Sequence, residues 1–189
     1  MCKHHLHFYE DHYPAQQASD FLVAGLEAGD SGLLLLTQPH RQAVERCLRA
    51  RGLRYEDACV FVDSDEAVAH IRASGSFDLR RARELLTPFM RAAAGRGSQR
   101  VRAVGDLAPT LCVAGQVDDA IAFEALVHDL TLEHGGSTLC AYALPQTADG
   151  FDLGLLYRLS AEHNAIQFPG QLWLERFALP GRAVRGASS

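Results

Sequence analysis

Apolar residues follow two patterns along this chain: short unbroken runs, and longer segments with a period near 3.6 residues. The runs "GLLLLTQ" at 32–38 and "ACVFVDS" at 58–64 have strand length, and an unbroken apolar run is typical of a strand covered on both faces. Helical spacing is clearest in "QVDDAIAFEALVHDLTLEHGG" at 116–136. The pattern predicts strands at 4–9, 32–38, 58–64, 100–106, 137–144, 164–168 and 172–179, and helices within 14–30, 39–52, 64–71, 78–96, 116–136 and 151–162.

Pro, Gly and Asp residues mark the ends of several predicted helices, and one Pro lies inside a helix. Pro39 and Gly52 flank one predicted helix in the order that helices favour. Asp78 is placed to cap the helix after it, and Pro88 should kink or divide that helix. Gly135 should end the helix at 116–136.

Strands that alternate with helices indicate βαβ units. We therefore predict one three-layer α/β domain over residues 1–179, with a mainly parallel sheet and helices on both faces. Residues 180–189 are small, polar and rich in Gly and Ser, so we expect a disordered tail.

Composition narrows the classes of function. The net charge of −5 argues against direct binding of nucleic acid, and no apolar run approaches the roughly 20 residues that span a bilayer. The N-terminus lacks the layout of a signal peptide, so we expect a cytoplasmic protein without a membrane partner. The sole lysine is Lys3, which excludes a phosphate-binding loop ending in Gly-Lys-Ser/Thr and disfavours a Schiff-base lysine.

Ligands of open parallel sheets bind beyond the carboxyl ends of the strands. The predicted strands place Tyr9, Glu10, Asp106 and Tyr142 at that rim. Acidic residues there also serve as helix caps, and both tyrosines could simply be half-buried core residues.

The first strand is rich in histidine. Because side chains alternate along a strand, His5 and His7 share one face and His4 lies on the other. An HxH pair can hold a zinc ion with a third ligand such as His12 or His163, but two alternate histidines are a weak signal, and a partly exposed edge or hydrogen-bonded core histidines explain the pair better. No metal is assigned, and His5, His7 and His12 remain a metal-binding alternative.

Two further candidates come from a helix and a strand. Glu124 and His128 are spaced i, i+4, so they form either an acid–base pair or, as we favour, a surface ion pair. Cys140 is expected to be a core residue rather than a nucleophile, because no helix N-terminus or basic neighbour would lower its pKa.

Several motifs, taken in order, resemble the MEDS sensory domain, which is named for methanogens, methylotrophs and the regulator DcmR. The similar stretches over residues 4–168 are "HHLHFYED", "FLVAGLEAGDSGLLLLTQPHRQAVERCLRARG", "VDSDEAVAHIRASGSFD", "RVRAVGDLAPTL", "FEALVHDL" and "TLCAYAL". His4, Phe8 and Tyr9 match the opening motif of the family, and His163 its terminal His. Three positions depart from the pattern: Asp106 replaces a usual Glu, Leu6 a common Cys, and His128 a frequent Asn.

The resemblance implies a RecA/KaiC-like sheet whose phosphate-binding loop is lost. The segment "YEDHYPAQQ" lies where such a loop would be, and it contains neither Gly nor Lys to hold phosphate. The resemblance further implies a non-enzymatic sensory domain without a cofactor. Its ligand would be small, with hydrocarbon-derived compounds among the candidates, and its output partner a separate kinase or transcription regulator, or a second copy of the chain.

We therefore expect a ligand site at the carboxyl rim of the sheet. The residues assigned to it are His4, Tyr9, Glu10, Asp106, Glu124, Tyr142 and His163. Two rival interpretations stay open: a nucleotide-binding or nucleotide-hydrolysing protein on a RecA-like sheet, and the metal protein that uses His5 and His7.

Overall fold

A computed structural model of the chain describes residues 3–52, 55–72, 75–95, 100–144, 146–147, 150–169 and 174–175. Within these residues the main sheet has the strand order β3-β2-β4-β5-β1-β8-β9. Its strands are β1 (Lys3–Tyr9), β2 (Ser31–Leu36), β3 (Cys59–Asp63), β4 (Val101–Gly105), β5 (Ser137–Ala143), β8 (Ala165–Gln167) and β9 (Leu174–Glu175). Pairing is parallel from β3 through β8, and β9 pairs antiparallel at one edge. A small hairpin, β6 (Gln146–Thr147) and β7 (Gly150–Phe151), lies outside this sheet.

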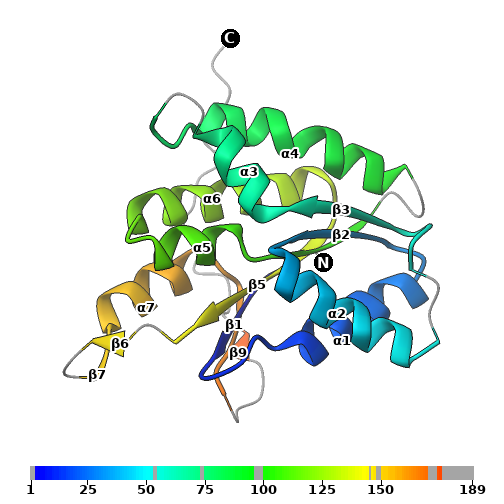
Figure 1. Cartoon of the computed structure of the whole chain (residues 1–189), viewed down its shortest axis with the longest axis horizontal. Helices are drawn as coiled ribbons and strands as arrows, with labels where there is room; N and C mark the ends of the chain where they lie inside the picture. The colour runs from blue at the N-terminus through cyan, green and yellow to red at the C-terminus, as the bar shows by residue number, and fades with distance from the viewer. Residues whose placement is uncertain are drawn as a thin grey trace.

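Helices cover both faces of the sheet (Figure 1). One face carries α1 (Ala15–Glu27) and α2 (Gln38–Ala50). The opposite face carries α3 (Ser64–Ile71), α4 (Leu79–Ala94), α5 (Leu107–Val113), α6 (Val117–Glu133) and α7 (Leu153–Ala161). The prediction of a three-layer α/β domain is therefore confirmed.

The unbroken leucine run of β2 shows why helices must pack on both faces of the sheet. Leu34 and Leu36 pack into the core with α1 and α2, whereas Leu33 and Leu35 pack into the cores on the other face. All four side chains are at most 6% exposed. Successive strand residues point to opposite faces, so a strand that is apolar throughout loses solvent contact only between two helical layers.

The helix ends agree with most of the sequence signals. The Asp78 carboxylate accepts hydrogen bonds from the backbone N–H groups of Arg80 and Arg81, which confirms it as the N-cap of α4. Gly135 has φ of +62°, the left-handed conformation that ends α6. Pro88 does not divide α4, since the helix continues from Leu79 to Ala94 around it. The packing of α4 against the sheet and α6 holds the helix together despite the missing N–H.

The tail predicted at 180–189 lies outside the described residues. Helix α5 was not predicted from the sequence. None of the described helices combines the length and apolar character that a membrane span requires.

Candidate functional site

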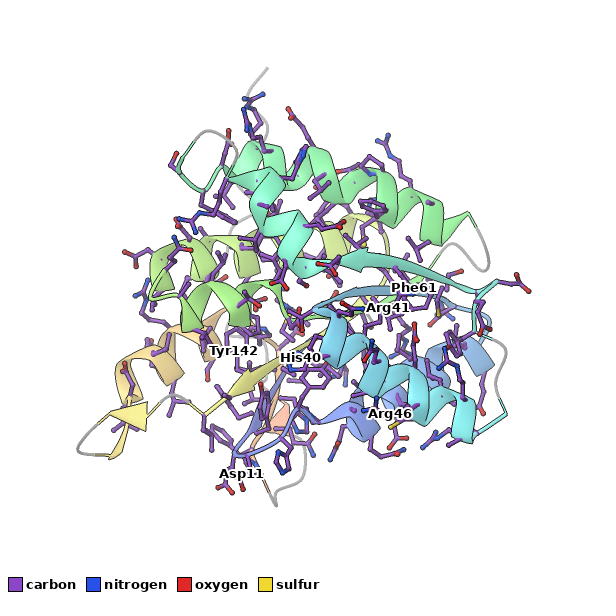
Figure 2. The ribbon with its side chains drawn as sticks, in the orientation of Figure 1. Asp11, His40, Arg41, Arg46, Phe61 and Tyr142 are labelled. Atoms are coloured by element: carbon purple, nitrogen blue, oxygen red, sulfur yellow. The ribbon has the colours of Figure 1, made fainter. Side chains whose placement is uncertain are left out.

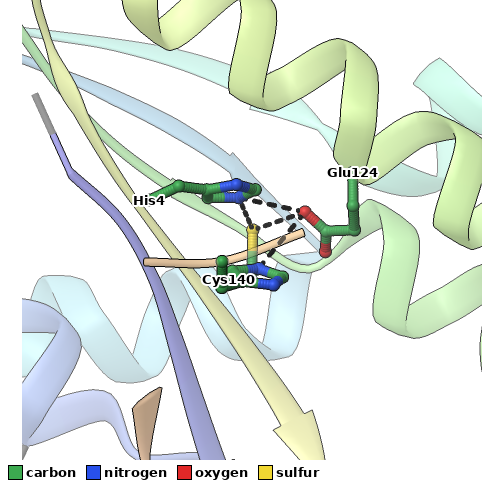
Figure 3. Close-up of side chains that lie close together, drawn as sticks. His4, Glu124 and Cys140 are labelled. Carbon is green, nitrogen blue, oxygen red and sulfur yellow. Dashed lines mark hydrogen bonds and ion pairs between the residues drawn. The ribbon is translucent and has the colours of Figure 1, made fainter. Parts of the chain in front are cut away.

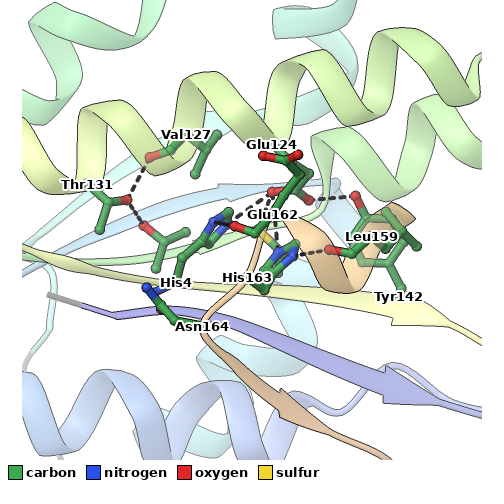
Figure 4. Close-up of polar contacts among 11 residues, drawn as sticks. His4, Glu124, Val127, Thr131, Tyr142, Leu159, Glu162, His163 and Asn164 are labelled. Carbon is green, nitrogen blue, oxygen red and sulfur yellow. Dashed lines mark hydrogen bonds and ion pairs between the residues drawn. The ribbon is translucent and has the colours of Figure 1, made fainter. Parts of the chain in front are cut away.

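Four side chains that can each donate an electron pair meet beneath α6. They are His4 from β1, Glu124 from α6, Cys140 from β5 (Figure 3) and His163 from the turn after α7 (Figure 4), and we call them the buried polar cluster. The side chains of His4, Glu124 and His163 have no exposed area, and Cys140 is 4% exposed. Polar groups so completely removed from water need partners to offset their desolvation, so their contacts decide what the cluster can do.

The sheet brings His4 and Cys140 together. β1 lies beside β5 in a register that pairs His4 with Thr138 and Leu6 with Cys140. Because side chains alternate between the two faces of a strand, His4 of β1 points toward α6, and so do Cys140 and Tyr142 of β5. The backbone N–H of His4 donates to Asn164 Oδ1 at 2.5 Å and its carbonyl accepts from Asn164 N–H at 2.9 Å, which holds this end of β1 beside His163 (Figure 4).

The functional atoms of the cluster lie at close distances. Glu124 Oε2 is 3.1 Å from His4 Nε2, 3.2 Å from Cys140 Sγ and 3.5 Å from His163 Nε2. His4 Nε2 is also 3.4 Å from Cys140 Sγ. The two imidazole rings lie side by side with centroids 4.0 Å apart. Three polar groups thus converge on one carboxylate oxygen.

Hydrogen bonds to the backbone assign the histidine tautomers. His4 Nδ1 lies 3.1 Å from the carbonyl of Glu162, and His163 Nδ1 lies 2.7 Å from that of Leu159 (Figure 4). A carbonyl only accepts, so each Nδ1 carries the proton. Burial lowers the pKa of both His4 and His163 to about 3, which keeps both rings neutral near neutral pH and leaves each Nε2 with a bare lone pair.

Tyr142 fixes the orientation of the Glu124 carboxylate. Its hydroxyl donates to Glu124 Oε1 at 2.5 Å, and burial raises the pKa of this hydroxyl well above its usual value. Oε1 is therefore engaged by Tyr142, while Oε2 faces the histidines and the thiol. Burial, together with the nearby Glu124, likewise raises the pKa of Cys140. The thiol keeps its proton and donates it to Oε2.

Asp106 belongs to a separate network at the carboxyl rim. Its buried carboxylate accepts from Thr37 N–H at 3.0 Å, from Thr37 Oγ1 at 2.9 Å and from Ser64 Oγ at 2.5 Å, and it lies 2.6 Å from His40 Nδ1. His40 stacks on Tyr13 with ring centroids 3.9 Å apart. Figure 2 labels His40 near the centre of the molecule, at the start of α2. These donors tie the ends of β2, β3 and β4 together.

The structure thus places the seven predicted site residues in two separate groups. It brings His4, Glu124, Tyr142 and His163 together beneath α6, on the face of the sheet. It places the other three at the rim, where Tyr9 is half-buried, Glu10 is exposed and Asp106 is buried.

Cys140 is the cluster residue that the sequence did not assign to the site. Its i, i+2 spacing from Tyr142 on β5 was the available signal, because that spacing puts both side chains on one face. The surface ion pair favoured for Glu124 and His128 is wrong: Glu124 is fully buried, and it accepts hydrogen bonds from Cys140 and Tyr142. The face of α6 that carries Glu124 packs on the sheet rather than facing solvent.

The alternative metal ligands lie elsewhere. His5 is partly buried against α1, where its ring contacts Phe21 with centroids 5.2 Å apart, and His12 is exposed. Among the described residues, the buried polar cluster is where three or more His, Cys, Asp or Glu side chains come within reach of one ion, and it contains none of His5, His7 and His12.

A cavity adjoins the buried polar cluster. It lies between the sheet and helices α4, α5 and α6, and the centre of a water molecule can occupy about 40 Å³ of it. Its wall is lined mainly by Leu33, Leu35, Leu86, Met90, Leu107, Phe123 and Leu130, with Cys140 on the side of the cluster. The hydroxyls of Thr131 and Thr138, also in the wall, bond each other at 2.6 Å, and Thr131 donates to the Val127 carbonyl. The cavity is therefore apolar apart from the sulfur.

Comparison with known proteins matches this chain to one family. No curated protein matches the chain. A sequence model of the MEDS family, described as the methanogen/methylotroph, DcmR sensory domain, matches residues 3–163. The match runs from β1 to the last residue of the cluster, His163, and so includes all four cluster residues. The chain belongs to the MEDS family of sensory domains.

Proposed function

We propose that this chain is a non-enzymatic sensory domain that binds a small apolar ligand in the cavity between the sheet and helices α4, α5 and α6. The observation that carries the proposal is the cavity itself, walled by leucine, methionine and phenylalanine side chains and bordered by Cys140. A dry apolar cavity accepts an uncharged molecule that fills it, because binding restores dispersion contacts that the wall otherwise lacks.

The size of the cavity sets the ligand class. One water centre needs roughly 10–15 Å³, so about 40 Å³ accommodates a compact molecule of about three heavy atoms. Short hydrocarbons and their halogenated or thiol derivatives have this size and polarity. The family match to a sensory domain supports the same class of role.

The rim offers a poorer site than the cavity. Four hydrogen-bonding groups of the protein already surround the carboxylate of Asp106, so a ligand there would have to displace them. The rim site with Tyr9 and Glu10 remains a prediction. So do the RecA/KaiC-like assignment, the cytoplasmic location and a separate kinase or transcription regulator as partner.

Xenon and dichloromethane are suitable probes, because both are small and apolar. In ¹H–¹³C methyl spectra, each should shift the resonances of Leu86, Met90 and Leu130, which line the cavity. A Val127→Phe substitution, which fills the cavity from α6, should abolish the shifts, whereas Ala143→Leu at an exposed position of β5 should leave them unchanged. Shifts confined to residues around Asp106 would instead favour the rim, and no shifts at all would contradict the proposal.

A further inference from the structure

We infer that His4, Glu124, Cys140 and His163 form a tetrahedral site for a zinc-type divalent metal ion. This site is different from the His5, His7 and His12 alternative suggested by the histidine-rich first strand. The inference does not depend on a ligand in the cavity, since it rests on the geometry and hydrogen bonds of the buried polar cluster alone.

The distances between donor atoms are close to those around zinc. Zinc binds nitrogen and oxygen at about 2.0–2.2 Å and sulfur at about 2.3 Å, so tetrahedral ligands lie roughly 3.3–3.7 Å apart. In the cluster, four of the six separations run from 3.1 Å for His4 Nε2 to Glu124 Oε2, through 3.2 Å and 3.4 Å, to 3.5 Å for His163 Nε2 to Glu124 Oε2. All four donors lie within 4.8 Å of one another. Small side-chain movements would bring them to a shared ion.

The orientation of the histidines is that of metal ligands. Each Nδ1–H is held by a backbone carbonyl, which aims the bare Nε2 at the centre of the cluster. A ligating histidine almost always donates its other N–H in this way, because the bond fixes both tautomer and ring angle. Likewise the bond from Tyr142 to Oε1 leaves Oε2 of Glu124 directed at the same point.

Without a cation, the cluster has more acceptors than donors. The Cys140 thiol supplies one proton for Oε2, but His163 Nε2, fully buried, has no hydrogen-bond partner among the described residues. His4 Nε2 and Glu124 Oε2 are both acceptors and lie only 3.1 Å apart. A cation between these atoms would accept one lone pair from each of them at once.

The charges of the ligand set also suit a divalent ion. On binding, Cys140 would release its proton to the solvent and coordinate as a thiolate, and Glu124 would coordinate as a carboxylate. Their two negative charges would balance the ion, so the buried site would be neutral, as a site shielded from water requires. A mixed set of two imidazoles, one thiolate and one carboxylate favours zinc or cobalt over calcium or magnesium, which prefer oxygen.

The test uses the full chain purified without a histidine tag, first analysed for bound metal and then stripped with a chelator and titrated with Zn²⁺ and Co²⁺. The expected stoichiometry is about one ion per chain, and Co²⁺ should give the strong visible bands of a tetrahedral site with a thiolate-to-cobalt charge-transfer band. A titration that saturates below about one tenth of an equivalent, or weak octahedral cobalt bands without charge transfer, would overturn the inference.

Matched variants assign the site to these residues. Cys140→Ser should abolish the charge-transfer band and weaken zinc binding by at least about 100-fold, while Cys47→Ser, on α2, should change neither. A His5→Gln/His12→Gln double variant should bind zinc like the original chain. If that double variant loses the metal and Cys140→Ser keeps it, the inference is wrong. Circular dichroism checks that each variant is folded. If Cys140→Ser does not fold, the cobalt spectrum of the unaltered chain decides whether a thiolate coordinates the metal.

Discussion

Glu124 shows how strongly the surroundings of a residue change its chemistry. On a solvated helix its carboxylate would be one more surface charge, but on the inner face of α6 it accepts from Tyr142 and Cys140 and faces two neutral imidazoles. Every group around it is a proton donor or a proposed metal ligand. Residues around Glu124 therefore offer the sharpest tests of the site.

Tyr142 is expected to orient Glu124 without touching the ion. A Tyr142→Phe substitution removes the hydroxyl that holds Oε1 and leaves the four proposed ligands in place. Zinc affinity should fall by about 10–100-fold, as is usual when a group that orients a ligand is lost. Competition titration with a chromophoric chelator measures the change. Tyr157→Phe, at an exposed tyrosine of α7, is the control, and equal affinities for the two variants would contradict this role.

Asp106 should contribute to stability through its acceptors. In Asp106→Asn an NH₂ group replaces one carboxylate oxygen, so at least one donor among Thr37, His40 and Ser64 loses its partner. The free energy of unfolding should fall by about 1–3 kcal/mol, the cost of an unsatisfied buried group. Urea denaturation followed by circular dichroism measures it. The exposed Asp129→Asn should stay within about 0.5 kcal/mol of the original chain, and a similarly small effect at Asp106 would refute the argument.

At the scale of elements, the close approach of β4 and β5 constrains the turn before β5. A Cβ atom on Gly136 would collide with the carbonyl oxygen of Val101, which belongs to the backbone and cannot rotate away. Gly136→Ala should therefore lower the free energy of unfolding by about 1–3 kcal/mol. Gly95→Ala, at the end of α4 where a Cβ meets no atom closer than 3.4 Å, is the matched control for thermal and urea unfolding. Equal stabilities of the two variants would show that the strands can separate at this point.

The connection from β1 to α1 bears on the nucleotide-binding rival. Residues 10–14 form this connection, and they contain no glycine or lysine to wrap a phosphate group. We expect isothermal titration with MgATP to show no binding tighter than about 1 mM. Micromolar affinity, or measurable ATP hydrolysis, would revive the rival and remove the non-enzymatic assignment.

For the whole molecule, the buried polar cluster joins segments from both ends of the domain. β1 carries His4 and the turn after α7 carries His163, and the central position of β1 between β5 and β8 lets the two meet. A metal ion there would link β1, β5, α6 and the turn after α7. Its binding energy would then oppose unfolding of the domain as a whole.

Metal loading should therefore raise global stability. At a free Zn²⁺ concentration about 100 times the dissociation constant, the free energy of unfolding should rise by about 2.7 kcal/mol. Differential scanning calorimetry of metal-free and zinc-loaded protein measures this as a higher midpoint, and excess chelator should reverse it. In Cys140→Ser the same addition should have little effect. A zinc-dependent rise of equal size in that variant would indicate binding outside the cluster.

Much of this protein could be predicted from its amino-acid sequence. The apolar runs and helical periods predicted the layers, and the Asp78 and Gly135 signals predicted two helix ends, because such patterns depend on local geometry. The motifs predicted the family, which the match over residues 3–163 confirms. Alternation along β1 correctly separated His4 from His5 and His7.

Only the tertiary structure decided which of the candidate residues meet. Strand order and register bring His4 beside Cys140, and the packing of α6 buries Glu124 against both, whereas Asp106 joins a different network at the rim. No local pattern contains this information, because strand order and helix packing arise from contacts between segments far apart in the chain. The protonation of the histidines has the same origin, since burial and two backbone carbonyls set it rather than the residues themselves.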